Sequence, residues 1–470
     1  MARKSYRYNR KKGSRQGRIP SFLIPKPSIE DLQKSLFEGA VGGPRIIPRP
    51  KHSISRKNIE PEALKVLYRL KDHGYLAYLV GGSVRDLLLG KKPKDFDIGT
   101  DATPEEIRRL FRYSRIIGKR FRLVHVYFRG GKIIEVSTFR RQIELDDREA
   151  MREGLGPESI FGTPKEDAFR RDLTINGLFY NIADFSVIDY VGGIDDLKAG
   201  IIRTIGDPER RFIRDPVRML RAIRHAARTG FRIDRVTWEA ILDHGSKIRL
   251  CAIPRVRDEW LKDLRSGFSA SWAKLMLDSN MFQHVFPRLW GYFCSTDGGQ
   301  ADQKTLDLFI SMLKEVDEVV RGDGKGLRDS FFLAAMLYPL LHFSPKWKAL
   351  EPVKVRWPTH EIRAIVDSAF FPYDFKRADR EHMAQLLSSQ WPIIFCVSKK
   401  RWQKRVYSKA LFPEALLLYN CLQRARGRKV LELDDIPGKK GQGSPKKRGR
   451  QGRRRGKSRY FRNKSGGKQT

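Results

Sequence analysis

Residues 79–98 read LVGGSVRDLLLGKKPKDFDI, and this stretch decides the fold of the chain. An apolar strand runs into Gly81-Gly82, where a short helix carrying Arg85 is expected to begin. Two glycines at a strand-to-helix turn let the backbone approach a phosphate closely, and the first N–H groups of the helix add the positive end of its dipole. The turn is therefore predicted to bind phosphate.

Two aspartates follow this turn, in the order Asp95-Phe96-Asp97-Ile98. In a strand, alternation places Asp95 and Asp97 on one face, ~7 Å apart, and the two apolar side chains on the other. Carboxylate oxygens are the ligands that Mg²⁺ prefers. A carboxylate pair beside a phosphate-binding turn predicts a site for Mg²⁺ on a nucleoside triphosphate, and hence nucleotidyl transfer.

The two motifs together, GGxVRD at 81–86 and DxD at 95–97, resemble those of the polymerase-β-like nucleotidyltransferases. Within that group they resemble the bacterial poly(A) polymerase and CCA-adding enzyme family. The resemblance covers residues ~75 to ~235. It implies an α+β fold, with a nucleotidyltransferase head (a small mixed sheet with helices) followed by an all-helical neck and body.

Three later stretches carry the same resemblance. GKRFRLVHV at 118–126 resembles the segment that sets bacterial poly(A) polymerases apart from their CCA-adding relatives. FRRDLTINGL at 169–178 resembles the RRDFTIN motif, with Leu173 in place of Phe, and RDPVRMLRAIRH at 214–225 resembles EDPxRMLRAxRF. This last stretch departs from its motif at Arg214. An acid accepts a hydrogen bond from the exocyclic amine of a base, whereas arginine only donates.

The resemblance implies roles for individual residues. As catalytic carboxylates it implies Asp95, Asp97 and, from the RRD motif, Asp172. Glu135 is the alternative third carboxylate, because it lies on a strand expected to pair near the aspartate strand. Asp95 and Asp97 are the expected ligands of two Mg²⁺ ions. The expected nucleotide-binding residues are Gly81, Gly82, Arg85, Arg171, Asn176, Asp215, Arg218 and Arg221.

The residues themselves suit these roles. A guanidinium such as that of Arg171 forms bidentate contacts with phosphate oxygens, and Asn176 can hydrogen-bond a ribose or a phosphate. Residues 212–228 have the apolar periodicity of one helix. A second face of this helix is basic, with Arg218, Arg221, His225 and Arg228. That face is either solvated or in contact with a polyanion.

The net charge of +40 also indicates a polyanionic partner. Residues 1–29 hold nine Lys/Arg and residues 439–470 hold fourteen, and neither segment holds an acid. The remaining +17 lies on residues 30–438, so the folded part is basic as well. A basic body with basic ends favours RNA, bound without sequence preference. The N-terminal segment alone could equally be a solubilising tail.

The chain is predicted to divide into five parts. These are a basic N-terminal arm (1–55), the head (56–195), a base-recognising neck (196–255), a helical RNA-binding body (256–436) and a disordered basic tail (437–470). The longest apolar run, 331–341, contains Pro339 and is too short to span a bilayer. Four scattered cysteines indicate reduced thiols, and together with the lack of an apolar leader they predict a cytoplasmic protein.

The sequence thus predicts a template-independent poly(A) polymerase that adds AMP from ATP to RNA 3′ ends with Mg²⁺. One alternative is a tRNA CCA- or A-adding nucleotidyltransferase. An alternative of another class is a non-catalytic RNA-binding protein with a relic head, which the retention of Asp95 and Asp97 disfavours.

Overall fold

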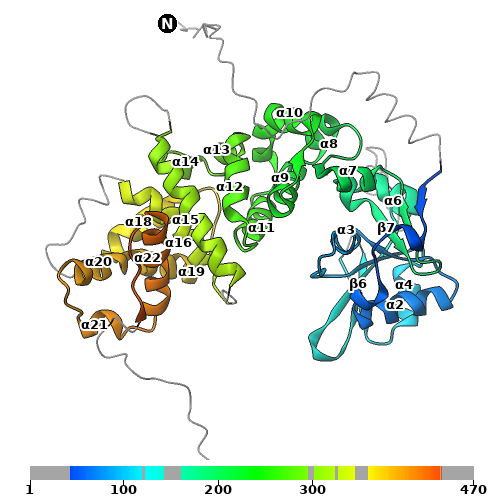
Figure 1. Ribbon diagram of the computed structural model, residues 1–470, viewed down its shortest axis with the longest axis horizontal. Helices are drawn as coiled ribbons and strands as arrows, with labels where there is room; N and C mark the ends of the chain where they lie inside the picture. Colours follow the sequence, from blue (N-terminus) through cyan, green and yellow to red (C-terminus); the bar gives the residue numbers. More distant parts are fainter. Residues whose placement is uncertain are drawn as a thin grey trace, which may run out of the picture.

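The structure, a computed structural model, describes residues 43–118, 122–141, 160–294, 301–322, 326–343, 358–433 and 436. Most of the predicted arm, residues 142–159 and the predicted tail lie outside these residues. Figure 1 shows the described elements as an arch. The head forms one end, α8 to α13 form the middle, and the remaining helices form the other end.

An eight-stranded sheet in the order β1-β8-β7-β2-β3-β6-β5-β4 organises the head. Only β3 and β6 run parallel, and the other neighbours are antiparallel. The predicted small mixed sheet is thereby confirmed. The strands are β1 (Arg45–Ile47), β2 (Ala77–Val80), β3 (Asp97–Thr100), β4 (Ser114–Ile117), β5 (Leu123–Tyr127), β6 (Ile133–Thr138), β7 (Leu178–Asn181) and β8 (Val187–Asp189).

Two helices, α2 and α4, pack against this sheet as their sequences direct. α2 begins at a proline, buries four apolar side chains, and packs against β2, β3 and β6. α4 follows a capping box, in which the N-cap Thr103 and Glu106 satisfy each other's backbone N–H groups. The helical segments of the head are α2 (Pro61–Asp72), α3 (Gly82–Leu88), α4 (Pro104–Leu110), α6 (Pro164–Arg170), α7 (Gly193–Ala199) and the 3₁₀ turns η1 (Arg49–Lys51), η2 (Arg56–Asn58), η3 (Arg129–Gly131) and η5 (Thr174–Asn176).

Two strands of the head sheet, β1 and β4, are not predicted from the sequence. β1 lies within the segment assigned to the arm, and its pairing with β8 adds residues 45–47 to the head sheet. The second, β4, covers residues 114–117 and pairs antiparallel with β5. Neither strand has the alternation of polar and apolar residues that marks a strand in a sequence.

The neck contains a helix break that the sequence analysis missed. The single helix predicted over 212–228 is two helices, α8 (Pro208–Arg214) and α9 (Val217–Thr229). Pro216 has no N–H to donate and disfavours helical geometry at Asp215 before it, so the first helix ends there. Asp215 accordingly has φ −146°. The other neck elements are β9 (Ile201–Ile202), β10 (Arg232–Ile233), α10 (Arg235–His244), η6 (Gly245–Leu250) and α11 (Ile253–Leu264).

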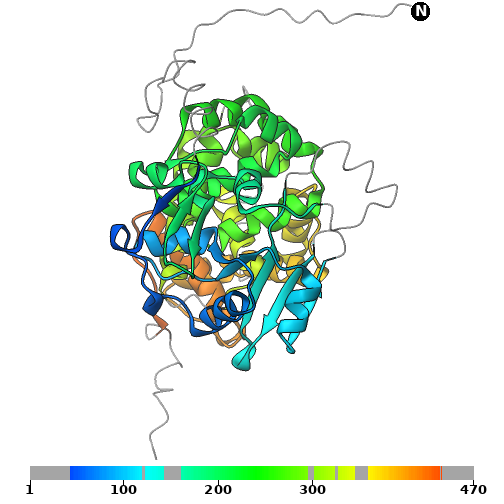
Figure 2. The same ribbon diagram turned by 90° about the vertical axis from the view of Figure 1, so that its right-hand side faces the viewer.

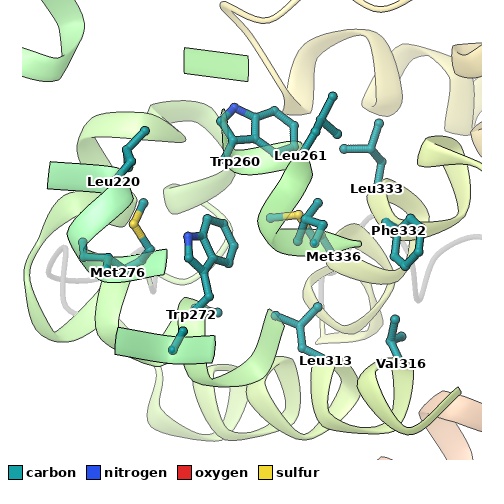
Figure 3. Close-up of a cluster of buried hydrophobic side chains, with 14 of the residues drawn as sticks. Leu220, Trp260, Leu261, Trp272, Met276, Leu313, Val316, Phe332, Leu333 and Met336 are labelled. Atoms are coloured by element: carbon teal, nitrogen blue, oxygen red, sulfur yellow. The ribbon is translucent and has the colours of Figure 1, made fainter. Parts of the chain in front are cut away.

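The body is all-helical, and one core joins it to the neck. Figure 3 shows this core, in which Trp260 of α11 and Trp272 of α12 lie near Leu220 of α9 and Leu313 of α15. Both tryptophans are fully buried. The body helices are α12 (Ser269–Asp278), α13 (Met281–Val285), α14 (Pro287–Trp290), α15 (Gln303–Arg321), α16 (Asp329–Phe343), α18 (Thr359–Ala369), α19 (Arg377–Ser388), α20 (Gln390–Ser398), α21 (Lys404–Tyr407) and α22 (Phe412–Ala425).

In a view turned by 90°, the head lies in front of the helices of the body (Figure 2). Within the described residues, no helix combines the length and the apolar character that crossing a membrane requires. All four cysteines are free thiols, and Cys396 and Cys421 are buried.

Candidate active site

Asp97 lies on the sheet as its sequence alternation predicts, and Asp95 lies just before the sheet. Asp97 is the first residue of β3 and Asp95 stands two residues before it, and both side chains are exposed. Phe96 and Ile98 point the other way, into the core. The apolar side chains thus anchor the segment and leave both carboxylates available on the outer face.

Glu135 lies directly beside Asp97. β6 runs parallel to β3, and Asp97 and Glu135 are partners in the strand register. The Glu135 side chain is half exposed, and its Oε1 atom lies 3.2 Å from Nε2 of His125 on β5. The parallel pairing therefore brings a third carboxylate next to the pair.

The pKa of Asp97 is raised to about 6. The dense protein around its carboxyl group is the main cause, although the side chain itself remains accessible, and the charges of Glu135 and Asp95 add to it. Arg171 acts in the opposite direction. A cation bound among these carboxylates would relieve their repulsion.

This donor set fits Mg²⁺, which takes one or two carboxylates together with substrate phosphates. Among the described residues, no three His, Cys, Asp or Glu side chains are gathered closely enough to hold a metal ion by themselves. Phosphate oxygens of a nucleotide would supply the missing ligands.

The glycine turn faces Arg171. Gly81 has φ +73°, and a Cβ atom at this position would lie 3.1 Å from Nη1 of Arg171. Nη2 of Arg171 donates to Asp167 at 2.7 Å, and the guanidinium carbon lies 5.3 Å from the ring centre of Phe179. Asp167 and Phe179 hold the arginine in place, with Nη1 directed at the turn.

Arg85 and Asn176 bind each other. Nη1 of Arg85 donates to Oδ1 of Asn176 at 2.7 Å, and its Nη2 donates to Asp86 at 2.8 Å. The ring of His225 lies 3.2 Å from Arg85 Nη1 and 3.3 Å from Asn176 Nδ2. Burial, followed by the charges of Arg85 and other arginines, lowers the pKa of His225 well below its usual range. The neutral imidazole belongs to a head–neck contact, so the open four-residue basic face expected on this helix is interrupted.

Asp172 is bound by two arginines of α9. Its carboxylate lies 2.6 Å from Nη1 of Arg218 and 2.6 Å from Nη1 of Arg221. Burial alone would raise the pKa of Asp172, but the two guanidinium groups outweigh it and lower the pKa. Arg221 also contacts Glu259 of α11 at 3.3 Å. These contacts tie Asp172 to the neck, whereas Glu135 is the carboxylate in register with Asp97.

Asp215 lies at the break between α8 and α9, with one oxygen engaged. Arg255 of α11 donates to Oδ2 at 2.7 Å, and Arg218 lies 3.7 Å from the same oxygen. Oδ1 is buried and has no hydrogen-bond partner among the described residues. The arrangement leaves one acceptor unused beside Arg218.

The sequence did not reveal the residues that hold the predicted site residues in place. Asp167 holds Arg170 and Arg171, and its spacing of three and four residues from them is a helical signal that could have found it. Glu259 and Arg255 come from α11, more than thirty residues beyond their partners. No local pattern could have indicated them.

Family models match two parts of the chain. The model described as "Poly A polymerase head domain" matches residues 77–203. The model described as "Probable RNA and SrmB- binding site of polymerase A" matches residues 230–293. The first spans every predicted catalytic residue, and the second begins at the end of α9.

Curated relatives extend this match. The chain is 47% identical over 323 residues to poly(A) polymerase I of Escherichia coli O6:H1, covering 67% of this chain and 68% of that one. It is 38% identical over 302 residues to the Haemophilus influenzae poly(A) polymerase I, covering 63% and 66%. A CCA-adding enzyme of Bacillus pumilus is 36% identical over 223 residues, covering 47% and 54%.

Solved structures agree on the architecture. The Bacillus stearothermophilus CCA-adding enzyme in complex with CTP has a TM-score of 0.58 at 25% identity, covering 78% of this chain and 79% of that one. The Thermotoga maritima CCA-adding enzyme complexed with tRNA has a TM-score of 0.52 at 22% identity, covering 78% and 80%, and shows the shared fold. With its head and two thirds of its length matched in this way, the chain belongs to the bacterial poly(A) polymerase and tRNA nucleotidyltransferase family.

Proposed function

We propose that this protein is a template-independent poly(A) polymerase, which adds AMP from ATP to RNA 3′ ends and releases pyrophosphate. The observation that carries the proposal is the 47% identity to a poly(A) polymerase I across two thirds of the chain. The CCA-adding relative matches less than half of the chain, at 36% identity. Membership of the family makes the protein a nucleotidyltransferase.

The reaction is an in-line displacement at the α-phosphorus of ATP. The RNA 3′-hydroxyl oxygen forms a bond to that phosphorus, the bond to the β-phosphate oxygen breaks, and pyrophosphate leaves. Asp97 and Glu135 are partners in the strand register and, together with Asp95, would hold Mg²⁺. Bound there, Mg²⁺ supplies charge neutralisation for the phosphates and favours ionisation of the hydroxyl.

We place Glu135 ahead of Asp172 as the third carboxylate. Glu135 is in register with Asp97 and has one weak partner, His125. Asp172 already neutralises Arg218 and Arg221. Its role is to orient these two arginines at the head–neck junction.

The triphosphate is held between the Gly81 turn and Arg171. The turn presents backbone N–H groups at the start of α3, and Nη1 of Arg171 is directed at it. Arg85 is buried and bound to Asn176, so it supports the phosphate-binding turn from the protein interior. Its contribution is positional, because its donors are engaged.

Asp215 and Arg218 select the base. The carboxylate of Asp215 can accept from the exocyclic amine of adenine, and Arg255 fixes its orientation through Oδ2. Arg214 stands where the family motif has an acid and contributes no acceptor. Base recognition therefore depends on a single carboxylate.

RNA binding is assigned to the remaining parts. The helical body and the basic ends hold RNA without sequence preference, and the division into arm, head, neck, body and tail is part of the proposal. Within the body, the ring centres of Trp402 and Phe412 lie 5.9 Å apart in an edge-to-face arrangement. Trp402, which has Lys and Arg residues near it in the sequence, therefore has a structural role. The four free thiols suit the cytoplasm, where we propose that the protein acts.

A primer-extension assay tests the proposal. The protein is incubated with Mg²⁺ and labelled ATP or CTP, together with oligo(A) or a tRNA lacking its CCA end. Long ladders with ATP alone are expected on oligo(A). Addition of one to three nucleotides on the tRNA only would instead identify a CCA- or A-adding enzyme. No incorporation on either substrate would identify a non-catalytic RNA-binding protein.

A further inference from the structure

A groove on the head lies between α2 and the β4–β5 hairpin. It has a volume of about 1170 Å³ and is lined by residues 64–73 in and just after α2, by residues 111–113 and by residues 126–129. Pockets for small ligands usually enclose about 300–1,000 Å³. The groove lies outside residues 230–293, which the family model described as an RNA-binding site matches.

The groove is strongly basic. Its lining carries the cations Lys65, Arg69, Arg112 and Arg129 against one carboxylate, Asp72. None of the four cations forms an ion pair with a carboxylate in the described ranges. The charges are therefore available to an anionic ligand.

Aromatic side chains alternate with these cations. Tyr113 is 72% exposed, and the guanidinium carbon of Arg112 lies 5.9 Å from its ring centre. Tyr127 is also exposed, and Phe128 is partly buried. A large exposed aromatic ring among cations is costly for folding alone but suits stacking on a nucleobase.

A row of side chains joins the groove to the catalytic carboxylates. Tyr127 lines the groove, and its ring centre lies 6.2 Å from that of His125 on the same strand. His125 contacts Glu135 at 3.2 Å, and Glu135 is in register with Asp97. The path spans three neighbouring strands, β3, β6 and β5, each about 4.8 Å from the next. A chain ending at the carboxylates can therefore reach the groove past Tyr127, the last residue of β5.

We propose that this groove binds single-stranded RNA, namely the part of the substrate a few nucleotides upstream of its 3′ end. The cations bind phosphates, and Tyr113 stacks on a base. The inference rests on the proposed function for the identity of the RNA, and it adds a binding site to the head itself. Charge alone would also admit an acidic peptide, but the exposed tyrosine beside Arg112 favours a ligand with flat aromatic rings.

Binding of fluorescent oligo(A) to the full chain tests the groove. A short oligo(A) that reaches only the carboxylates is compared with a long one that extends into the groove. Tyr113→Ala is expected to weaken binding of the long oligo(A) about fivefold or more, because one stacked base is lost. Lys65→Gln is expected to reduce the salt slope of long-oligo binding by about 1. Lys71→Gln, an exposed lysine of the same helix outside the groove lining, is the matched control and should change neither quantity.

The outcomes of this binding test can be distinguished from those of the assay that tests the proposed function. Loss of affinity confined to the long oligo(A), with an unchanged thermal midpoint, supports the groove. Equal affinity of wild type and Tyr113→Ala for the long oligo(A) would overturn it. Displacement of the RNA by polyglutamate at equal charge would also overturn it, since the site would then recognise acidic peptide. Because binding is measured without ATP, a failure to incorporate AMP contradicts the proposed function and leaves this test unaffected.

Discussion

Two groups of carboxylates in this molecule have opposite surroundings. On the sheet, Asp97 is in register with Glu135 and is influenced by Asp95, and its pKa is raised to about 6 although Arg171 acts in the opposite direction. At the head–neck junction, Asp172 is enclosed by two arginines and its pKa is lowered. Carboxylates that are not paired with arginines are available to Mg²⁺, whereas a neutralised one holds two parts of the protein together. The identity of a carboxylate's neighbours, more than its place in a motif, separates the two roles.

The largest expected effect follows from replacing Asp95, one of the carboxylates expected to bind Mg²⁺. Asp95→Ala should lower the rate of AMP incorporation by about 10²- to 10³-fold or more, because charge on the reacting phosphates is no longer offset. Oligo(A) affinity should stay near that of wild type, since this carboxylate serves the metal rather than the RNA. The rate is measured by primer extension and the affinity by fluorescence anisotropy. Activity within tenfold of wild type would contradict the assignment.

The variants Glu135→Gln and Asp172→Asn compare the two groups of carboxylates directly, because each removes one carboxylate charge from one group. Glu135→Gln should lower kcat by about 10²-fold and raise the Mg²⁺ concentration needed for half-maximal rate. Asp172→Asn should leave that concentration unchanged. It should destabilise the protein by about 3 kcal/mol, because Arg218 and Arg221 lose a partner. Mg²⁺ titrations and urea unfolding give both quantities, and the reverse pattern would return the third-carboxylate role to Asp172.

Mg²⁺ affinity should depend on pH through Asp97. Only the ionised carboxylate binds the cation, so protonation competes with Mg²⁺ as the pH falls below about 6. The Mg²⁺ concentration for half-maximal rate should rise about tenfold per pH unit below that value and be flat above pH ~7. Measurements at several pH values check this. A midpoint near that of an ordinary aspartate, about 4, would show that the neighbours do not act on Asp97.

Arg255 should affect base selection to a smaller extent. Arg255→Gln frees the second oxygen of Asp215, so the carboxylate loses its fixed orientation. The preference for ATP over CTP, compared as kcat/KM on oligo(A), should fall about fivefold, which corresponds to about 1 kcal/mol. Arg257→Gln on the same helix is the matched control, because Arg257 pairs at the surface with Asp258 and a backbone carbonyl. An unchanged preference in Arg255→Gln would remove Arg255 from base selection.

The smallest expected effect is on stability. Asp97 has a folded-state pKa above its unfolded value, so the folded protein loses stability as the pH rises from about 4 to about 6. Asp97→Asn should therefore stabilise the metal-free protein at neutral pH, by about 1 kcal/mol once solvent screening is allowed for. The difference should vanish below pH ~4 and reverse when Mg²⁺ and ATP are added. Thermal unfolding at the two pH values, with and without the ligands, measures it.

Much of the head could be predicted because its signals are local. The glycine turn and the alternation around Asp97 each lie within a few residues, and each stands where it was expected. The structure departs from prediction where signals are short or broken. β1 has three residues, and Pro216 divides a periodic stretch into two helices.

What the sequence by itself determined is the set of chemical groups: the glycine turn, the two aspartates and the arginine-rich motifs. The tertiary structure decided which of these groups meet. The parallel pairing of β3 and β6 joins Asp97 to Glu135 across thirty-eight positions of sequence, and the packing of α9 and α11 joins Asp172 to arginines and Asp215 to Arg255. The physical reason is that a carboxylate's charge and availability depend on neighbours within a few ångströms, and chain spacing does not record those neighbours.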